Sequence, residues 1–160
     1  MTKGAFADSE RLARVGELAS LHATQPGALL PLLHAVQEEL GHIADADIPV
    51  IAKTLNLSRA EVHGVVTFYH DFRRQPAGRH VVRLCRAESC QARGGAAIEA
   101  VAAARLGVAM GSTRSDGQVS LEPVYCLGLC AVGPSALVNG RPVARIDAAA
   151  IERIAIEVAA

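Results

Sequence analysis

Apolar residues recur at helical spacing through the first 75 positions and predict four short helices. Their expected bounds lie near residues 9–19, 28–40, 47–55 and 58–69. The inward faces, in chain order, are Leu12, Val15 and Leu18; Leu29, Leu32, Leu33, Val36 and Leu40; Ile48, Ile51 and Leu55; and Val62, Val65 or Val66, and Tyr69. We expect Ser9 to cap the first helix, Gly41 to end the second, and the capping-box pattern Ser58-Arg59-Ala60-Glu61 to open the fourth.

The pattern changes after Arg74-Gln75-Pro76-Ala77-Gly78, which is typical of a linker or tight connection. Strands and helices alternate beyond it, in the predicted order β-α-β-β-β-α. The expected elements are a strand over His80–Leu84, an Ala-rich helix from Gly94 to Leu106, a strand around Val119 and Leu121, a hairpin of Ala136–Val138 and Pro142–Ile146 joined by Asn139-Gly140, and a last helix capped by Asp147. The pattern therefore predicts a helical half and an α/β or α+β half.

Composition narrows the function classes. The chain is 51% hydrophobic and 20% charged, which is typical of a globular protein. Its 16 basic and 16 acidic side chains balance, so no positive electrostatic field attracts nucleic acid. Its five aromatic residues offer few surfaces on which bases could stack. No apolar stretch approaches the roughly 20 residues of a membrane helix. The first residues do not form a secretory signal, so we expect a cytoplasmic protein without direct membrane insertion.

Four cysteines carry the candidate chemistry, in the pattern Cys85-x4-Cys90 and Cys126-x3-Cys130. In a cytoplasmic chain, closely spaced cysteines indicate metal or redox chemistry rather than disulfides. Neither pair has the C-x-x-C spacing of a thioredoxin-type dithiol. Two pairs satisfy a [2Fe–2S] cluster, in which each iron takes two thiolates; structural zinc and buried free cysteines are the alternatives.

The neighbours of the cysteines favour the cluster. Gly94-Gly95, Gly128 and Gly133 lie close to the pairs and allow backbone amides to approach sulfur. Residues 71–95 hold six arginines against two acidic residues. We expect Arg86 and Arg93 to offset the negative charge of a cluster and to raise its reduction potential, a solvated basic face being the alternative.

Other motifs give little support to further chemistry. None of the six histidines has metal-ligand spacing, so we expect surface or packing roles for them. No phosphate-binding glycine motif predicts a nucleotide site. Residues 67–72 concentrate three of the five aromatic side chains, which indicates core packing or, alternatively, a surface that faces a partner.

Three segments resemble one known family. These are residues 28–43, residues 62–69, and the cysteine set in which Cys126-Leu127-Gly128-Leu129-Cys130 leads to Gly133-Pro134. Together they are similar to the thioredoxin-like [2Fe–2S] subunits of NADH-dehydrogenase modules, over about residues 10 to 150. The resemblance implies an α+β protein with an N-terminal helical bundle (1–75), followed by a thioredoxin-like [2Fe–2S] ferredoxin domain (76–160). Because the helical bundle holds no metal ligands, we expect it to dock a partner.

The resemblance also implies a site and a role. One [2Fe–2S] cluster would be held by Cys85, Cys90, Cys126 and Cys130, with each pair serving one iron. The chain would have no catalytic residue of its own. It would carry single electrons beside a flavoprotein subunit that binds FMN and NAD.

The segment Leu84–Ala92 and the short N-terminus look most like the gamma subunit of soluble NAD-dependent formate dehydrogenases. That subfamily would add a larger Fe–S and molybdenum catalytic subunit as a partner. The alternatives are the same role in complex I or in an NAD-linked hydrogenase, and a zinc-stabilised scaffold module without redox activity. A free-standing ferredoxin-like dimer is disfavoured, because a simple shuttle needs no helical extension.

Overall fold

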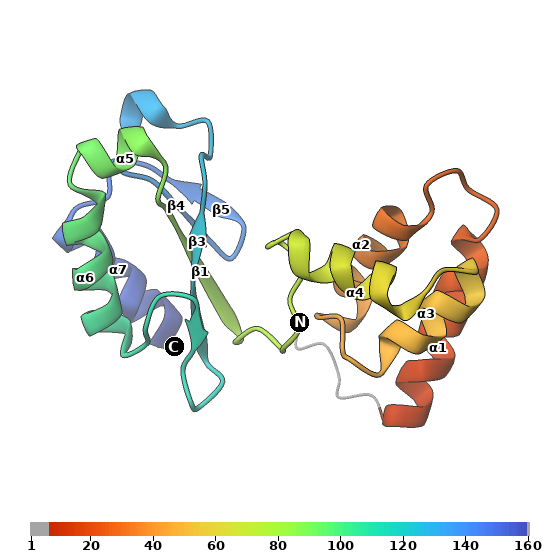
Figure 1. The fold of residues 1–160 in the computed structure, drawn as a ribbon. Coiled ribbons are helices and arrows are strands. Elements are labelled where there is room, and N and C mark those ends of the chain that lie inside the picture. The colour runs from red at the N-terminus through yellow and green to blue at the C-terminus, as the bar shows by residue number, and fades with distance from the viewer. Residues whose placement is uncertain (1–6, 160) are drawn as a thin grey trace. The chain divides into compact units, whose positions relative to one another are not determined.

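The computed structural model describes residues 7–159. The chain divides into two compact units, Met1–Pro76 and Ala77–Ala160, shown in Figure 1. The first unit consists of helices and the second of a mixed sheet with helices on it, which is the α+β class that the sequence predicts.

The helical unit contains α1 (Asp8–His22), α2 (Leu29–Leu40), α3 (Asp47–Leu55) and α4 (Arg59–Phe68). All four predicted helices are present, and their apolar faces form one core. Its fully buried members include Val15, Leu32, Leu33, Val36, Ile51 and Val62. The amphipathic periodicity of the sequence therefore specifies this unit well.

Two of the three predicted helix ends are confirmed. Ser58 accepts the Glu61 N–H at 3.1 Å and Glu61 accepts the Ser58 N–H at 2.8 Å, which completes the capping box of α4. Gly41 ends α2 with a φ of 86°. The prediction for Ser9 is wrong: α1 starts at Asp8, two residues earlier than a Ser9 cap implies, with Ala7 at the cap and Glu10 accepting the Ala7 N–H.

A buried ion pair joins α1 to α3. The Arg11 guanidinium donates to both carboxylate oxygens of Asp47, at 3.0 and 2.6 Å, and Asp47 has no exposed surface. Arg11 also donates to the His42 carbonyl, and the Ala44 N–H donates to Asp47. Every charge in this group thus has several partners, as a buried ion pair requires.

Side chains of α2 hold the segment that follows α4. Gln37 donates to the Asp71 carbonyl and accepts the Arg73 N–H, at 2.7 and 2.6 Å. Between these contacts Phe72 is buried, with its ring 5.0 Å from that of His34. The aromatic segment is therefore divided: Phe72 packs in the core, whereas Phe68 is 73% exposed and Tyr69 is 43% exposed. The prediction that Tyr69 faces inward is wrong, because α4 ends at Phe68 and the helical period stops there.

The second unit has a five-stranded sheet in the order β2-β3-β1-β4-β5. Its elements are β1 (His80–Cys85), α5 (Glu88–Ala92), α6 (Gly95–Leu106), β2 (Ser112–Thr113), β3 (Val119–Val124), the 3-10 helix η1 (Cys130–Val132), β4 (Ala136–Val138), β5 (Arg141–Val143) and α7 (Ala148–Ala159). Strands β1 and β3 are parallel, and the other neighbours are antiparallel. In Figure 1, α6 and α7 lie beside one another next to the sheet.

The core of this unit joins α6 and α7 to one face of the sheet. Val82, Leu84, Val119 and Leu121 pack there with buried residues of both helices. Asp147 caps α7 as predicted, because it accepts the Ala150 N–H at 2.7 Å. Three features differ from expectation: α5 occupies the predicted loop between the first two cysteines, β2 is additional, and β5 ends at Val143, before the predicted Ile146. Within residues 7–159, no helix is long and apolar enough to cross a membrane.

Candidate metal centre

The sheet topology brings the cysteine segments to one edge. Cys85 is the last residue of β1 and pairs with Val124, the last residue of β3. Because parallel strands end at the same edge, Cys126 emerges next to Cys85. Strand β4 runs antiparallel to β1 and starts at this edge, since Ala136 pairs with Leu84. The segment from Cys130 to β4 therefore arrives there too.

The second cysteine pair has the spacing of two ligands on one ion. The Cys126 and Cys130 sulfurs lie 3.7 Å apart. Two thiolates on a tetrahedral ion with metal–sulfur bonds of about 2.3 Å lie roughly 3.8 Å apart. Cys126 has a φ of 71°, unusual for a residue other than glycine, and its side chain is exposed. This pair fits a tetrahedral thiolate-bound metal without rearrangement of the loop.

The first pair is buried, and hydrogen bonds converge on it. Burial raises the pKa of the Cys85 thiol, but bonds from the Ala87 N–H, the Cys90 thiol and the N–H groups of Cys126 and Leu127 outweigh that effect, so the pKa is lowered. Cys90 is 1% exposed. Backbone amides directed at a sulfur stabilise its thiolate, which is the form that binds metal.

The four sulfurs influence one another. The Cys126 thiol raises the pKa of Cys130 most, through a hydrogen bond and through charge repulsion; burial, Cys90 and Cys85 raise it further. Such repulsion between thiolates disappears when they share a cationic metal centre. Among the residues described, no group of three or more Cys, His, Asp or Glu side chains surrounds a single ion position. The thiols instead form two pairs at one edge, and a two-iron cluster uses two thiolates for each iron.

The glycines near the cysteines have three different roles. A Cβ on Gly133 would lie 3.1 Å from the Cys90 sulfur, so this glycine allows the loop to cover that sulfur. A Cβ on Gly95 would lie 2.8 Å from the Cys90 carbonyl oxygen, so Gly95 provides close backbone packing. Gly128 supplies a φ of 74° between Cys126 and Cys130. The amides that stabilise the Cys85 sulfur come from Ala87, Cys126 and Leu127, and the Gly94 N–H donates to the Gln91 carbonyl.

The two arginines expected beside the site have partners of their own. Arg86 forms an ion pair with Glu99 at 3.0 Å. Arg93 donates to the carbonyls of Ala131 and Gly133, at 3.1 and 3.5 Å. Arg93 thus braces the loop that carries Cys130, whereas the charge of Arg86 is offset by a neighbouring carboxylate.

One residue at the site carries no motif in the sequence. Ser135 is 2% exposed, and its hydroxyl oxygen lies 3.7 Å from the Cys90 sulfur. Its carbonyl accepts the Cys85 N–H at 2.9 Å. In the sequence, Ser135 is marked only as a polar residue immediately before the apolar run Ala136–Val138. The register of β4 on β1 is what places Ser135 at the cysteine site.

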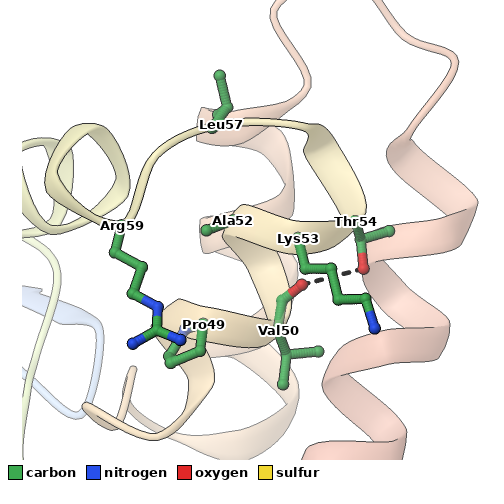
Figure 2. A pocket seen from close by; sticks show the side chains of 7 residues that line it. All are labelled: Pro49, Val50, Ala52, Lys53, Thr54, Leu57 and Arg59. Carbon is green, nitrogen blue, oxygen red and sulfur yellow. Dashed lines mark hydrogen bonds between the residues drawn. The ribbon is translucent and has the colours of Figure 1, made fainter.

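The histidine of the sheet unit lies away from the cysteines, and the helical unit has a surface hollow of its own. His80, the histidine of the sheet unit, begins β1 at the end opposite Cys85 and contacts Asn139 at 3.0 Å. Figure 2 shows an open hollow on the helical unit, lined by Pro49, Val50, Ala52, Lys53, Thr54, Leu57 and Arg59. It contains no thiol, imidazole or carboxylate that would bind a metal.

Paired thiols at the edge of a thioredoxin-like sheet define a class of metal–thiolate proteins, and comparison with known proteins gives the family. The model of the thioredoxin-like [2Fe-2S] ferredoxin family matches residues 15–159. A subunit of the NADH-quinone oxidoreductase of Pseudomonas aeruginosa is 36% identical over 112 residues, which are 70% of this chain and 68% of that protein. The subunit of the same name from Escherichia coli K12 is 38% identical, with the same coverage.

A solved structure gives a similar result. The NAD+-reducing [NiFe]-hydrogenase in the air-oxidized state aligns with a TM-score of 0.69 and 28% identity, over 86% of this chain. The alignment covers only 23% of that longer chain. The chain described here belongs to the thioredoxin-like [2Fe-2S] ferredoxin family, and its cofactor is one [2Fe–2S] cluster. The family therefore decides for the cluster over the zinc and free-cysteine alternatives.

Proposed function

We propose that this chain is an electron-transfer subunit whose [2Fe–2S] cluster is held by Cys85, Cys90, Cys126 and Cys130. The observation that carries the proposal is the convergence of two thiol pairs at one sheet edge in a member of this family. When bound, such a cluster accepts and donates one electron at a time. The chain's own groups bind and orient it: the thiolates supply ligands, the amides of Ala87, Cys126 and Leu127 stabilise sulfur, and Gly133 closes the loop over Cys90.

The metal content of full-length purified protein tests this assignment. We expect visible absorbance, close to two irons and two acid-labile sulfides per chain, and an EPR signal that appears only after reduction. Zinc at full occupancy in a colourless protein would instead identify a scaffold module. Iron without labile sulfide, or a four-iron spectrum, would also contradict the proposal.

The partner proposed is a flavoprotein that binds FMN and NAD, because the similar proteins are a subunit of NADH-quinone oxidoreductase and an NAD+-reducing hydrogenase. The helical unit offers a docking surface, which we call the aromatic groove. Phe68 and Tyr69 stand exposed there, edge to face with centroids 5.1 Å apart, beside Leu30 and Val65. Exposed aromatic residues next to an apolar hollow are typical of interface anchors. Phe72, buried behind Tyr69, supports the ring from within.

Co-purification of the full chain with the flavoprotein tests the docking proposal. Phe68→Asp should abolish it while the cluster spectrum stays unchanged, because Phe68 lies outside the core. Leu21→Asp is the matched control, since Leu21 is similarly exposed, at 68%, but lies outside the groove. Equal co-purification of both variants would assign the groove another role.

The parent complex proposed is a soluble NAD-dependent formate dehydrogenase, with a larger Fe–S and molybdenum subunit as a further partner. The Leu84–Ala92 segment around the first two cysteines supports this choice. Complex I and an NAD-linked hydrogenase are the alternatives, in agreement with the proteins found to be similar. Isolation of the native complex decides: formate-dependent NAD reduction with molybdenum supports the proposal, whereas nickel or quinone reduction contradicts it.

A further inference from the structure

We propose that the Ser135 hydroxyl donates a hydrogen bond to the Cys90 sulfur and thereby raises the reduction potential of the cluster. This inference rests on the proposed function, because it takes Cys90 to be an iron ligand. It assigns Ser135 as a positioning and tuning residue beyond the four cysteines.

Ser135 is held firmly in the fold. The Cys85 N–H donates to the Ser135 carbonyl at 2.9 Å, which continues the β1–β4 ladder one step past the pair of Leu84 with Ala136. Ser135 is 2% exposed and Cys90 is 1% exposed. The 3.7 Å between Oγ and Sγ is thus a contact between two buried groups, Ser135 beside β4 and Cys90 in α5.

The direction of the bond follows from the chemistry of the ligand. Between a thiol and a hydroxyl, either group can donate. A thiolate bound to iron has no proton, so in the loaded protein the Ser135 hydroxyl is the donor and Sγ the acceptor. Gly133 also packs against this sulfur, because a Cβ at that position would lie 3.1 Å from it.

The sign of the effect follows from charge. Reduction adds one electron from an external donor, breaks no bond, and leaves the proton on Ser135 Oγ. The extra negative charge is shared with the ligand sulfurs, so a donor beside one of them stabilises the reduced form more than the oxidised form. Burial strengthens this difference because water does not screen it. Cys85 is stabilised by backbone amides, which truncation of a side chain does not remove, whereas the bond to Cys90 depends on one side chain.

The experiment is a dithionite titration of full-length protein, followed by EPR, for wild type, Ser135→Ala and Ser89→Ala. We expect Ser135→Ala to lower the ratio of reduced to oxidised cluster about tenfold at a given potential, which corresponds to about 59 mV for one electron. Ser89→Ala is the matched control: its hydroxyl lies near the site but is directed at the Cys130 carbonyl, so the potential should not move.

The pair Ser135→Thr and Ser135→Val separates the hydroxyl from packing, because the two side chains have nearly the same shape and only Thr donates. A higher reduction potential in Ser135→Thr than in Ser135→Val supports the proposal. This comparison holds even if Ser135→Ala does not retain a cluster. Equal potentials in Thr and Val, or a wild-type potential in Ser135→Ala, overturn it. Loss of the cluster in all Ser135 variants, but not in Ser89→Ala, would assign Ser135 to packing alone. Wild-type protein without a [2Fe–2S] spectrum would contradict the proposed function itself.

Discussion

The two units place their polar groups in opposite ways. In the helical unit the buried charge of Asp47 is paired with the Arg11 guanidinium and the Ala44 N–H. In the sheet unit the thiols lie at one edge, and neighbouring thiols lower the pKa of Cys85 and raise that of Cys130. The helical unit pairs its buried charge within its core, and the sheet unit presents its thiols where a metal can bind them. The comparison predicts that the stability of the helical unit and the binding of the cluster can be disturbed separately.

The largest effect on one unit alone is expected from substitution of the cysteines, which should affect the cluster and leave the helical unit unchanged. Cys90→Ala or Cys126→Ala should remove most of the cluster, because in each variant one iron loses one of its two protein ligands. The helix content of the first unit should not change. Iron and sulfide analysis with far-UV circular dichroism checks both statements. His63→Ala, an exposed control in α4, should retain the full cluster; loss there would contradict the all-cysteine ligand set.

Substitution of Asp47 should have the opposite result: it should destabilise the helical unit and leave the cluster unchanged. Asp47→Ala leaves the Arg11 charge nearly buried, at 11% exposure, and removes the partner of the Ala44 N–H. We expect the free energy of unfolding of the helical unit to fall by about 3 kcal/mol, with unchanged visible absorbance of the cluster. Urea unfolding followed by both signals measures this. Asp45→Ala is the control, because Asp45 pairs with Arg74 at the surface and should cost less than about 0.5 kcal/mol.

The same substitution should have opposite effects in the two units. Gly64 lies in α4 with open space at its Cβ position, so Gly64→Ala should stabilise the helical unit by about 0.5–1 kcal/mol. Gly133→Ala would bring a methyl group to 3.1 Å from the Cys90 sulfur and should speed cluster loss to a chelator severalfold. Thermal unfolding and the rate of bleaching measure the two effects; equal bleaching of Gly133→Ala and wild type would show that the loop adjusts freely.

A smaller effect concerns pH. Burial, followed by repulsion from Arg11, lowers the pKa of His42 below its ordinary value of 6.5. The unfolded chain therefore binds the proton first, so the stability of the helical unit is complete above about pH 6.5 and decreases as the pH falls toward the folded-state pKa. His42→Gln should reduce this slope. Urea midpoints of both proteins, measured from about pH 7.5 down to about pH 5 and so on both sides of the ordinary histidine pKa, provide the test.

The smallest effect is expected on the reduction potential, from substitution of Arg93 and Arg86. Arg93→Gln should lower the reduction potential slightly, because a positive charge that braces the Cys130 loop is lost. Arg86→Gln should lower it less, since Glu99 already offsets that charge. Redox titration at low and high salt compares them. A larger shift for Arg86 would mean that the Glu99 pair does not form in solution.

The sequence predicted the two units unequally for a physical reason. Helical periodicity located α2, α3 and α4 closely, because each apolar face must reach one core. It misplaced Tyr69, since the helix ends one residue before it and the period no longer applies. The cysteine pattern indicated a two-pair site, but α5, the role of Gly133 and the contact of Ser135 depend on strand register and loop conformation. Such long-range contacts leave no periodic trace in a single sequence.

The exposure of Cys126 has a consequence for the lifetime of the protein. Cys90 is sealed under Gly133 and Ser135, whereas Cys126 faces solvent. Oxidants and chelators therefore reach the site from the Cys126 side, and this side sets how long an isolated chain survives in air. Once the metal is lost, the Cys126 and Cys130 sulfurs, 3.7 Å apart, need to move only about 2 Å closer to form a disulfide. A partner that covers this edge would protect the chain from that oxidation.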